Sequence, residues 1–255
     1  SDVYKRQPDV RGPGAADIGA GARGLRRALA RGPLTIVALG PLTNVAAALD
    51  GRPRLQANVT RLVAVMGRRR GHVFHPSEGN GNGVLFGHGP VFTDFNVRQD
   101  PDAAQRVLAM DLPVTLLPYE VGRAVSIDAA DLERLSAAGG AAAWAANGSR
   151  DWLRFWNEAV GLPGFYPFDL LAAAYVLRPQ YFHCATVHTW VVAARDPFGW
   201  LFDPVSVLVG VPGERPENVR VATRTLYCPH VDPAVHCALM AHLLDASLHL
   251  AGPSP

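Results

Sequence analysis

Three short polar segments, each beside an apolar run, contain the side chains best suited to chemistry. They are Gly-Pro-Leu-Thr-Asn at residues 40–44, Thr-Asp-Phe-Asn at residues 93–96, and residues 165–172, in which Asp169 heads an otherwise apolar stretch. A strand that ends at a Gly-Pro turn leaves backbone carbonyl oxygens pointing outward, and Ca²⁺ prefers such hard ligands. Thr43 or Asn44 also suits the cap of a following helix. Both interpretations of the first segment therefore stay open.

The other two segments carry carboxylates. Alternation along residues 93–96 would place Asp94 and Asn96 on one face and Phe95 on the other. A carboxylate beside an amide can accept from and donate to the hydroxyls of a sugar, although an ordinary turn before a helix has the same pattern. Asp169 is either a plain helix cap or a carboxylate held at a helix start to bind a cation.

Histidines are a weaker signal for a site. His72, His75 and His88 share a long segment rich in glycine, asparagine and histidine, residues 67–89. A loop of that length inside a compact domain is usually functional or mobile. A transition-metal site there is conceivable, but the spacing does not establish one.

The elements that position these segments alternate between strand and helix. Strands are predicted at residues 34–39, 61–66, 113–117, 187–194 and 219–226. Helices are predicted at residues 15–31, 45–49, 101–110, 128–135, 141–160, 169–177 and 233–250, with Asp100 capping the third of them. This alternation predicts an α/β fold with a largely parallel sheet, whose ligands bind at the carboxyl ends of the strands. We expect one domain at residues 15–251 after an irregular start at residues 1–14.

Composition excludes several classes of protein. A net charge of +2 gives no electrostatic footprint for nucleic acid or an anionic membrane. No apolar run approaches the roughly 18 residues of a membrane span. The three cysteines are odd in number and form no Cys-x-x-Cys pair, which predicts reduced, buried thiols in a cytoplasmic protein.

Taken together and in this order, the segments resemble the inosine-uridine preferring nucleoside hydrolase family. The matching stretches are LTIVALGPLTNVAAAL at residues 34–49, Met-Gly at residues 66–67, DFNVRQDPDAA at residues 94–104, LPYEV at residues 117–121 and DLLAAAYVLRP at residues 169–179. The resemblance spans nearly the whole chain. It implies a Rossmann-like open, mostly parallel sheet with flanking helices, and hydrolysis of the N-glycosidic bond of purine or pyrimidine nucleosides to free base and ribose.

The resemblance also implies a site. Family members bind one Ca²⁺, for which the main-chain carbonyl of Thr43 and the carboxylate of Asp169 would be ligands. Asn96 would contact the ribose, as would Asp94, which stands where the family usually has glutamate. His88 aligns by spacing with an asparagine of the family, and Asn80 or Asn82 could serve instead if residues 67–89 fold back. Phe168 stands where many members place a histidine that protonates the leaving group.

One departure bears on activity. The Asp-x-Asp-x-Gly-x-Asp-Asp segment, which supplies most of the family's metal ligands and its water-activating base, does not occur in the 255 residues. We therefore expect an N-terminally truncated member that is inactive as it stands, with no catalytic base to name, from an active parent that forms a homo-oligomer. A non-catalytic riboside-binding relative, suggested by Asp94 and Phe168, and an unrelated α/β protein are the alternatives.

Overall fold

The computed structural model describes residues 15–69, 95–194, 205–211 and 223–250. The chain forms two compact units. The first contains the described residues of 15–69, 95–120, 184–194, 205–211 and 223–229, and the second those of 121–183 and 230–250.

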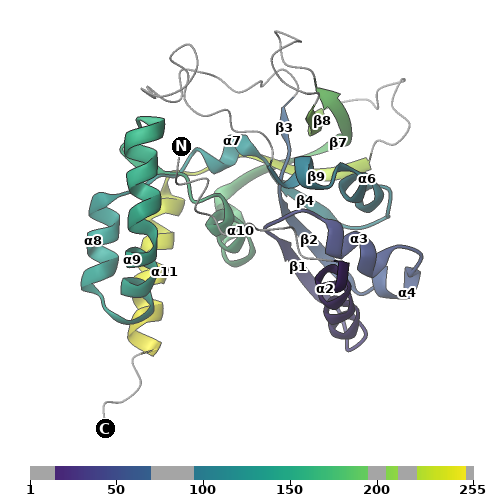
Figure 1. The fold of residues 1–255 in the computed structure, drawn as a ribbon, viewed down its shortest axis with the longest axis horizontal. Coiled ribbons are helices and arrows are strands. Elements are labelled where there is room, and N and C mark those ends of the chain that lie inside the picture. Colours follow the sequence, from purple (N-terminus) through teal and green to yellow (C-terminus); the bar gives the residue numbers. More distant parts are fainter. Residues whose placement is uncertain (1–14, 70–94, 195–204, 212–222, 251–255) are drawn as a thin grey trace. The chain divides into compact units, whose positions relative to one another are not determined.

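A seven-stranded sheet forms the first unit (Figure 1). Its strands lie in the order β1 (Leu34–Ala38), β2 (Val59–Val65), β4 (Val114–Leu117), β9 (Thr223–Val231), β7 (Phe182–Ala194), β8 (Val205–Val211) and β3 (Arg68–Arg69). β1, β2, β4 and β9 pair in parallel, β3 is parallel to β8, and β7 and β8 are antiparallel. The predicted α/β fold with a mostly parallel sheet is confirmed.

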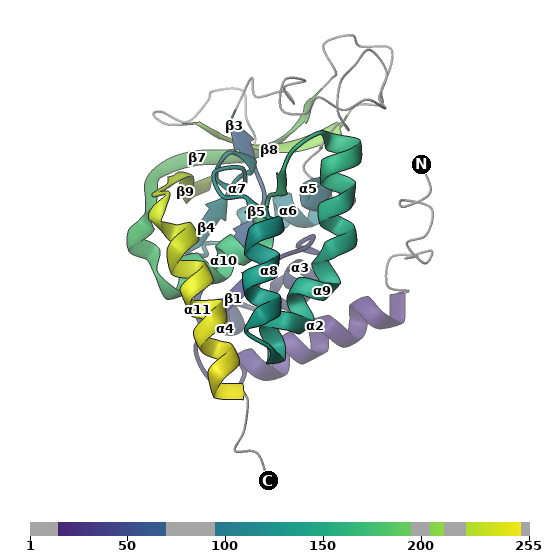
Figure 2. The same cartoon turned by 90° about the vertical axis from the view of Figure 1, so that its left-hand side faces the viewer.

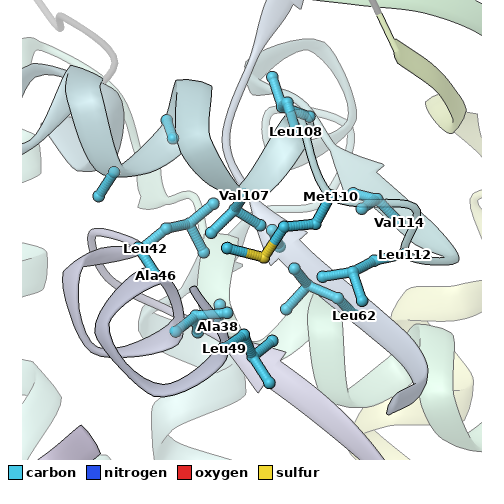
Figure 3. Packing of buried hydrophobic residues seen from close by; sticks show 14 of the residues in the cluster. Ala38, Leu42, Ala46, Leu49, Leu62, Val107, Leu108, Met110, Leu112 and Val114 are labelled. Atoms are coloured by element: carbon cyan, nitrogen blue, oxygen red, sulfur yellow. The ribbon is translucent and has the colours of Figure 1, made fainter. Parts of the chain in front are cut away.

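Helices of the first unit pack beside β1, β2 and β4 (Figure 1). They are α2 (Ala15–Leu29), α3 (Thr43–Leu49), α4 (Pro53–Gln56), α5 (Phe95–Gln99) and α6 (Pro101–Leu108). Figure 3 shows the thioether of Met110 among Leu42, which precedes α3, Leu62 of β2 and Val107 of α6. Burial of one such side chain contributes about 1.5–3 kcal/mol.

Most predicted elements are confirmed. The strands predicted at residues 34–39, 61–66 and 113–117, and the helices predicted at residues 15–31, 101–110 and 169–177, end within two residues of the observed elements. Asp100 caps α6 as expected, because its Oδ1 accepts a hydrogen bond from the Ala103 amide at 2.9 Å. β8 was not predicted, and β7 begins five residues before its predicted start at residue 187.

The predicted cap of α3 is wrong. The helix begins at Thr43, its N-cap is Leu42, and no side chain caps it. Thr43 instead donates its hydroxyl hydrogen to Oδ2 of Asp100, at 2.6 Å. Asn44 packs against α2, where a Cβ on Gly21 would lie 2.9 Å from Asn44 Nδ2.

The prediction of three reduced cysteines is also wrong. Cys184 of β7 and Cys228 of β9 form a disulfide, whereas Cys237 is free and exposed. The pair is separated by 44 residues in sequence, so only the placement of β7 beside β9 in the sheet brings the two thiols together.

Helices dominate the second unit. α8 (Ala129–Ala137), α9 (Gly140–Phe155) and α11 (Ala234–Leu250) lie side by side (Figure 2). α9 continues into a π-helical turn at Trp156–Val160. The unit also holds α10 (Phe168–Leu177), a 3₁₀ turn at Pro179–Tyr181 and a two-stranded sheet of β5 (Ile127–Asp128) and β6 (Gly164–Phe165). None of the helices in the described ranges combines the length and apolar character needed to cross a bilayer.

A buried carboxylate ties α8 to α11. Asp131 is only 3% exposed. Its Oδ2 lies 2.9 Å from Nε2 of His236, its Oδ1 pairs with Arg134, and it completes a capping box with Asp128. Burial alone would raise the pKa of Asp131, but the hydrogen bonds from Arg134, His236 and the Asp128 backbone together outweigh it and lower the pKa below 3.8.

The disulfide predicts both a thiol count and a stability difference. Unfolded without reductant, the protein should expose one reactive thiol, that of Cys237, and three after reduction. Replacing both bridged cysteines (Cys184→Ser with Cys228→Ser) should lower the free energy of unfolding by about 2–4 kcal/mol, because the bridge constrains the unfolded chain. Cys237→Ser is the control and should leave stability unchanged. Three thiols in the non-reduced protein would contradict the bridge.

Asp131 predicts how stability depends on pH. Because its folded-state pKa lies below the unfolded value of 3.8, its contribution is present above about pH 4 and is lost as the pH falls through the folded-state pKa. Asp131→Asn should lower the free energy of unfolding at neutral pH by about 1–3 kcal/mol and flatten the acid limb. Denaturant unfolding at several pH values measures both. The matched control is Asp151→Asn, whose exposed carboxylate pairs with Arg154 on the surface and should matter little. Equal acid limbs in wild type and Asp131→Asn would refute the assignment.

Candidate functional site

The carboxyl ends of β1, β2 and β4 define the edge of the sheet where a site is expected. These strands are parallel neighbours, so their carboxyl ends meet at the same edge. The segments that leave this edge are residues 39–44 after β1, residues 66–67 after β2 and residues 118–122 after β4. Two of the three polar segments singled out in the sequence, those around Thr43 and Asn96, contact one another here.

The side chain of Asn96 forms hydrogen bonds with the backbone at the carboxyl ends of both β1 and β2. Its Nδ2 donates to the carbonyl oxygen of Val65 at 2.8 Å and to that of Leu39 at 3.2 Å. Only the NH₂ end of an amide can donate two hydrogen bonds, so these contacts fix which way the amide points. The next residue, Val97, is fully buried and anchors α5. No donor from the described part of the chain reaches Asn96 Oδ1, which is left as an acceptor.

Thr43 lies at the start of α3, and its side chain is held by Asp100. The hydroxyl donates to Asp100 Oδ2 at 2.6 Å, and Asp100 Oδ1 accepts from the Ala103 amide. Residues 39–44 and residues 96–100 therefore meet at two points, one through Asn96 and the other through Asp100. Asp100 was predicted as a helix cap, but its contact with Thr43 was not predicted.

The extended backbone expected over residues 93–96 is not found at Phe95 and Asn96, the two residues of that segment that the structure describes. α5 places Phe95–Gln99 in a helix, so side-chain direction there follows the helical period. Asp94 and His88, both predicted to contact substrate, lie outside the described residues, as do His72 and His75.

Glu120 is a carboxylate at the same edge that sequence analysis did not single out. It lies in α7 (Tyr119–Gly122), directly after β4. Both of its carboxylate oxygens are 3.2 Å from the hydroxyl of Tyr227, whose side chain is buried in β9. Its position three residues after a buried strand could have marked Glu120 as a candidate site residue. Its contact with Tyr227 could not be predicted, because the two residues are 107 apart in sequence.

Asp169 and Phe168 belong to the second unit, at the start of α10. Pro167 is the N-cap residue of this helix, so Asp169 is not the plain cap that was one of its two interpretations. Partial burial removes water from the carboxyl group and raises the pKa of Asp169. No side chain or backbone amide of the described residues donates a hydrogen bond to it.

Phe168 is part of an aromatic cluster. A Cβ on Gly122 would lie 2.0 Å from Cδ1 of Phe168, so only glycine leaves room for the ring. Tyr166 packs edge-on against Phe168 with ring centroids 5.9 Å apart, and Trp156 packs in the same way against Tyr166 at 4.8 Å. The ring is therefore positioned by packing and has no proton to transfer.

The described residues do not by themselves make a complete calcium site. Among them, no group of three or more histidine, cysteine, aspartate or glutamate side chains is placed to hold a metal ion. Ca²⁺ takes six to eight oxygen ligands, and the two proposed from the sequence, the Thr43 carbonyl and the Asp169 carboxylate, are too few.

Comparisons with known proteins agree with the fold and with the family resemblance. The family model for inosine-uridine preferring nucleoside hydrolases matches residues 7–226. The pyrimidine-specific ribonucleoside hydrolase RihA of Salmonella agona is 32% identical over 161 residues, which is 62% of this chain and 46% of the relative. RihA of Salmonella typhimurium is 30% identical over the same length. The chain thus spans about half the length of the curated relatives that it matches.

Solved structures give the same fold. A plant nucleoside hydrolase, the PpNRh1 enzyme, superposes with a TM-score of 0.68 at 20% identity, covering 89% of this chain and 67% of that one. The purine-preferring ribonucleoside hydrolase from Gardnerella vaginalis superposes with a TM-score of 0.67 at 19% identity, covering 89% and 66%. With the family match extending from residue 7 to residue 226, this chain belongs to the inosine-uridine preferring nucleoside hydrolase family.

Proposed function

We propose that the protein acts as a ribonucleoside hydrolase, which cleaves the N-glycosidic bond of a nucleoside to give free base and ribose. The observation that carries the proposal is the Asn96 amide at the carboxyl edge of the sheet. Both of its N–H groups are used by the ends of β1 and β2, so its Oδ1 offers a fixed acceptor. A ribose hydroxyl is a donor that fits this acceptor.

The remaining substrate contacts that we propose come from the family resemblance. They are Asp94, His88, Phe168 and Asp169. Asp94 would accept a second sugar hydroxyl, and Phe168 offers an apolar face within its aromatic cluster. The proposed catalytic base is not among the 255 residues, because these contain no Asp-x-Asp-x-Gly-x-Asp-Asp segment.

The reaction breaks the bond between C1′ of the ribose and the base nitrogen. The electron pair leaves with the base, positive charge develops on the sugar, and the oxygen of a water adds to C1′. One proton of that water must pass to a base and the leaving nucleobase must gain one. A carboxylate near the sugar, such as Asp169, would stabilise the developing charge.

We also propose that Ca²⁺ is the cofactor, with the Thr43 main-chain carbonyl and Asp169 among its ligands. A partly desolvated carboxylate that receives no hydrogen bond from the described residues favours a nearby cation. When bound, the ion would orient water and ribose hydroxyls. We assign no reaction step to it, because the described residues alone do not complete its coordination. For the same reason, and because the base is absent, we propose that the 255-residue chain alone does not turn over nucleosides.

A second function is favoured by Phe168. The ring is packed against Gly122 and stands where many family members place a protonating histidine. A relative that binds ribosides without hydrolysing them would tolerate this change. Homo-oligomer formation remains a prediction. A cytoplasmic location also remains a prediction. It was inferred from three reduced thiols, but Cys184 and Cys228 form a disulfide.

Hydrolysis is tested with the natural gene product that contains this chain. Incubation with inosine, uridine, adenosine and cytidine should release free base and reducing sugar in equal amounts from at least one of them. A chelator should abolish the release, and excess Ca²⁺ should restore it. Riboside binding without release would establish the non-catalytic function instead, and neither binding nor release would reject both.

Asn96→Asp tests the amide at the edge of the sheet. The substitution keeps the shape but places an acceptor against the carbonyl oxygens of Leu39 and Val65. It should lower the free energy of unfolding by about 1–3 kcal/mol and lower kcat/KM or riboside affinity by about tenfold or more, equivalent to about 1.4 kcal/mol.

The matched control is Asn58→Asp. Asn58 Nδ2 donates to the Leu29 carbonyl oxygen at 2.8 Å, at the other end of β2. This variant should lose similar stability but keep riboside affinity. If Asn96→Asp and Asn58→Asp change affinity equally, Asn96 has no direct role in binding.

A further inference from the structure

Asp100 does more than cap a helix. Each of its carboxylate oxygens accepts a different hydrogen bond, Oδ1 from the Ala103 amide at 2.9 Å and Oδ2 from the Thr43 hydroxyl at 2.6 Å. The first bond begins α6. The second crosses 57 residues of sequence to the start of α3. A serine or asparagine can satisfy the cap, but a carboxylate provides two equivalent acceptors and, when ionised, stronger hydrogen bonds.

Asp100 ends a five-residue segment, residues 96–100, that begins with Asn96. At one end of it, Asn96 Nδ2 binds the carbonyl oxygens that end β1 and β2. At the other end, Asp100 binds Thr43. Between them, Val97 is fully buried, which resists rotation of the segment. Residues 96–100 are therefore held at both ends against the loop that leaves β1.

The two attachments depend on each other. If Asp100 lost Thr43, residues 39–41 would keep only one of their two attachments to residues 96–100, although Leu42 would stay buried in the core, and the Leu39 carbonyl could shift from Asn96. The Leu39 contact, at 3.2 Å, is the longer of the two that Asn96 makes, so it would be lost first. The amide could then rotate and its Oδ1 would no longer point in a fixed direction.

We propose that Asp100 is a positioning residue for the riboside site, which orients the Asn96 amide by holding Thr43. The inference rests on the proposed function for the identity of the ligand. The coupling between Asp100, Thr43 and Asn96 does not depend on the proposed function, and it can be measured without any ligand.

Three substitutions separate the coupling from the cap. Asp100→Ser keeps a cap for the Ala103 amide but lacks the second oxygen for Thr43. Thr43→Val keeps the shape of the side chain and removes the hydroxyl, whereas Thr43→Ser restores it. Asp128→Ser is the matched control, because it makes the same change at the N-cap of α8.

The readouts are hydrogen exchange of the Asn96 side-chain amide, followed by nuclear magnetic resonance on the full chain, and inosine affinity by calorimetry. Asp100→Ser, Thr43→Val and their combination should each accelerate exchange by about tenfold, the effect of one net hydrogen bond, and weaken inosine binding by a similar factor. The double variant should be no worse than either single one. Thr43→Ser and Asp128→Ser should keep the wild-type exchange rate.

Two results would overturn the proposal. One is unchanged exchange at Asn96 in Asp100→Ser. The other is a double variant whose effect is the product of the two single effects, because independent contacts multiply. If the wild-type protein binds none of inosine, uridine, adenosine and cytidine, the proposed function fails, and the exchange rates alone decide whether Asp100 positions Asn96.

Discussion

Parallel strands that end at one edge of a sheet leave backbone carbonyl groups that need hydrogen-bond partners. In this protein the groups are the carbonyls of Leu39 after β1 and Val65 at the end of β2, and one side chain, Asn96, serves both. A partner is needed most at Val65, whose contact with Asn96 is partly buried, whereas the contact with Leu39 is exposed. This hydrogen-bonding pattern has a chemical consequence. Asn96 Nδ2 donates to both carbonyl groups, and Oδ1 remains available as an acceptor. The ligand chemistry that we propose depends on this division.

The rest of the first unit supports that arrangement. α3 and α6 pack together in the core, where Leu42 directly precedes α3 and Val107 lies in α6, and the starts of both helices lie at the same edge. Asp100 then joins them through Thr43. A dense apolar core below a few polar contacts is the usual means by which a fold holds a site in one geometry. In the second unit, Asp131 likewise makes several polar contacts with one side chain: its buried carboxylate completes the capping box of α8 and hydrogen-bonds His236 of α11.

Features that depend on a local sequence pattern could be predicted. The apolar run before Gly40 predicted β1, and Asp100-Pro101 predicted the start of α6. The motifs around Thr43 and Asn96 gave the family. Features that depend on pairing between distant residues were missed: the Thr43–Asp100 contact spans 57 residues, the Glu120–Tyr227 contact 107, and the Cys184–Cys228 bridge 44. β8 was also not predicted, because the short apolar run at residues 205–211 has no period that distinguishes a strand from a buried helix.

The account is tested most directly by a crystal structure of the natural protein with a bound riboside. We expect a ribose hydroxyl about 2.5–3.0 Å from Asn96 Oδ1, with Nδ2 still on the carbonyls of Leu39 and Val65. A sugar bound elsewhere, or an Asn96 amide turned so that its nitrogen faces the sugar, would contradict the account.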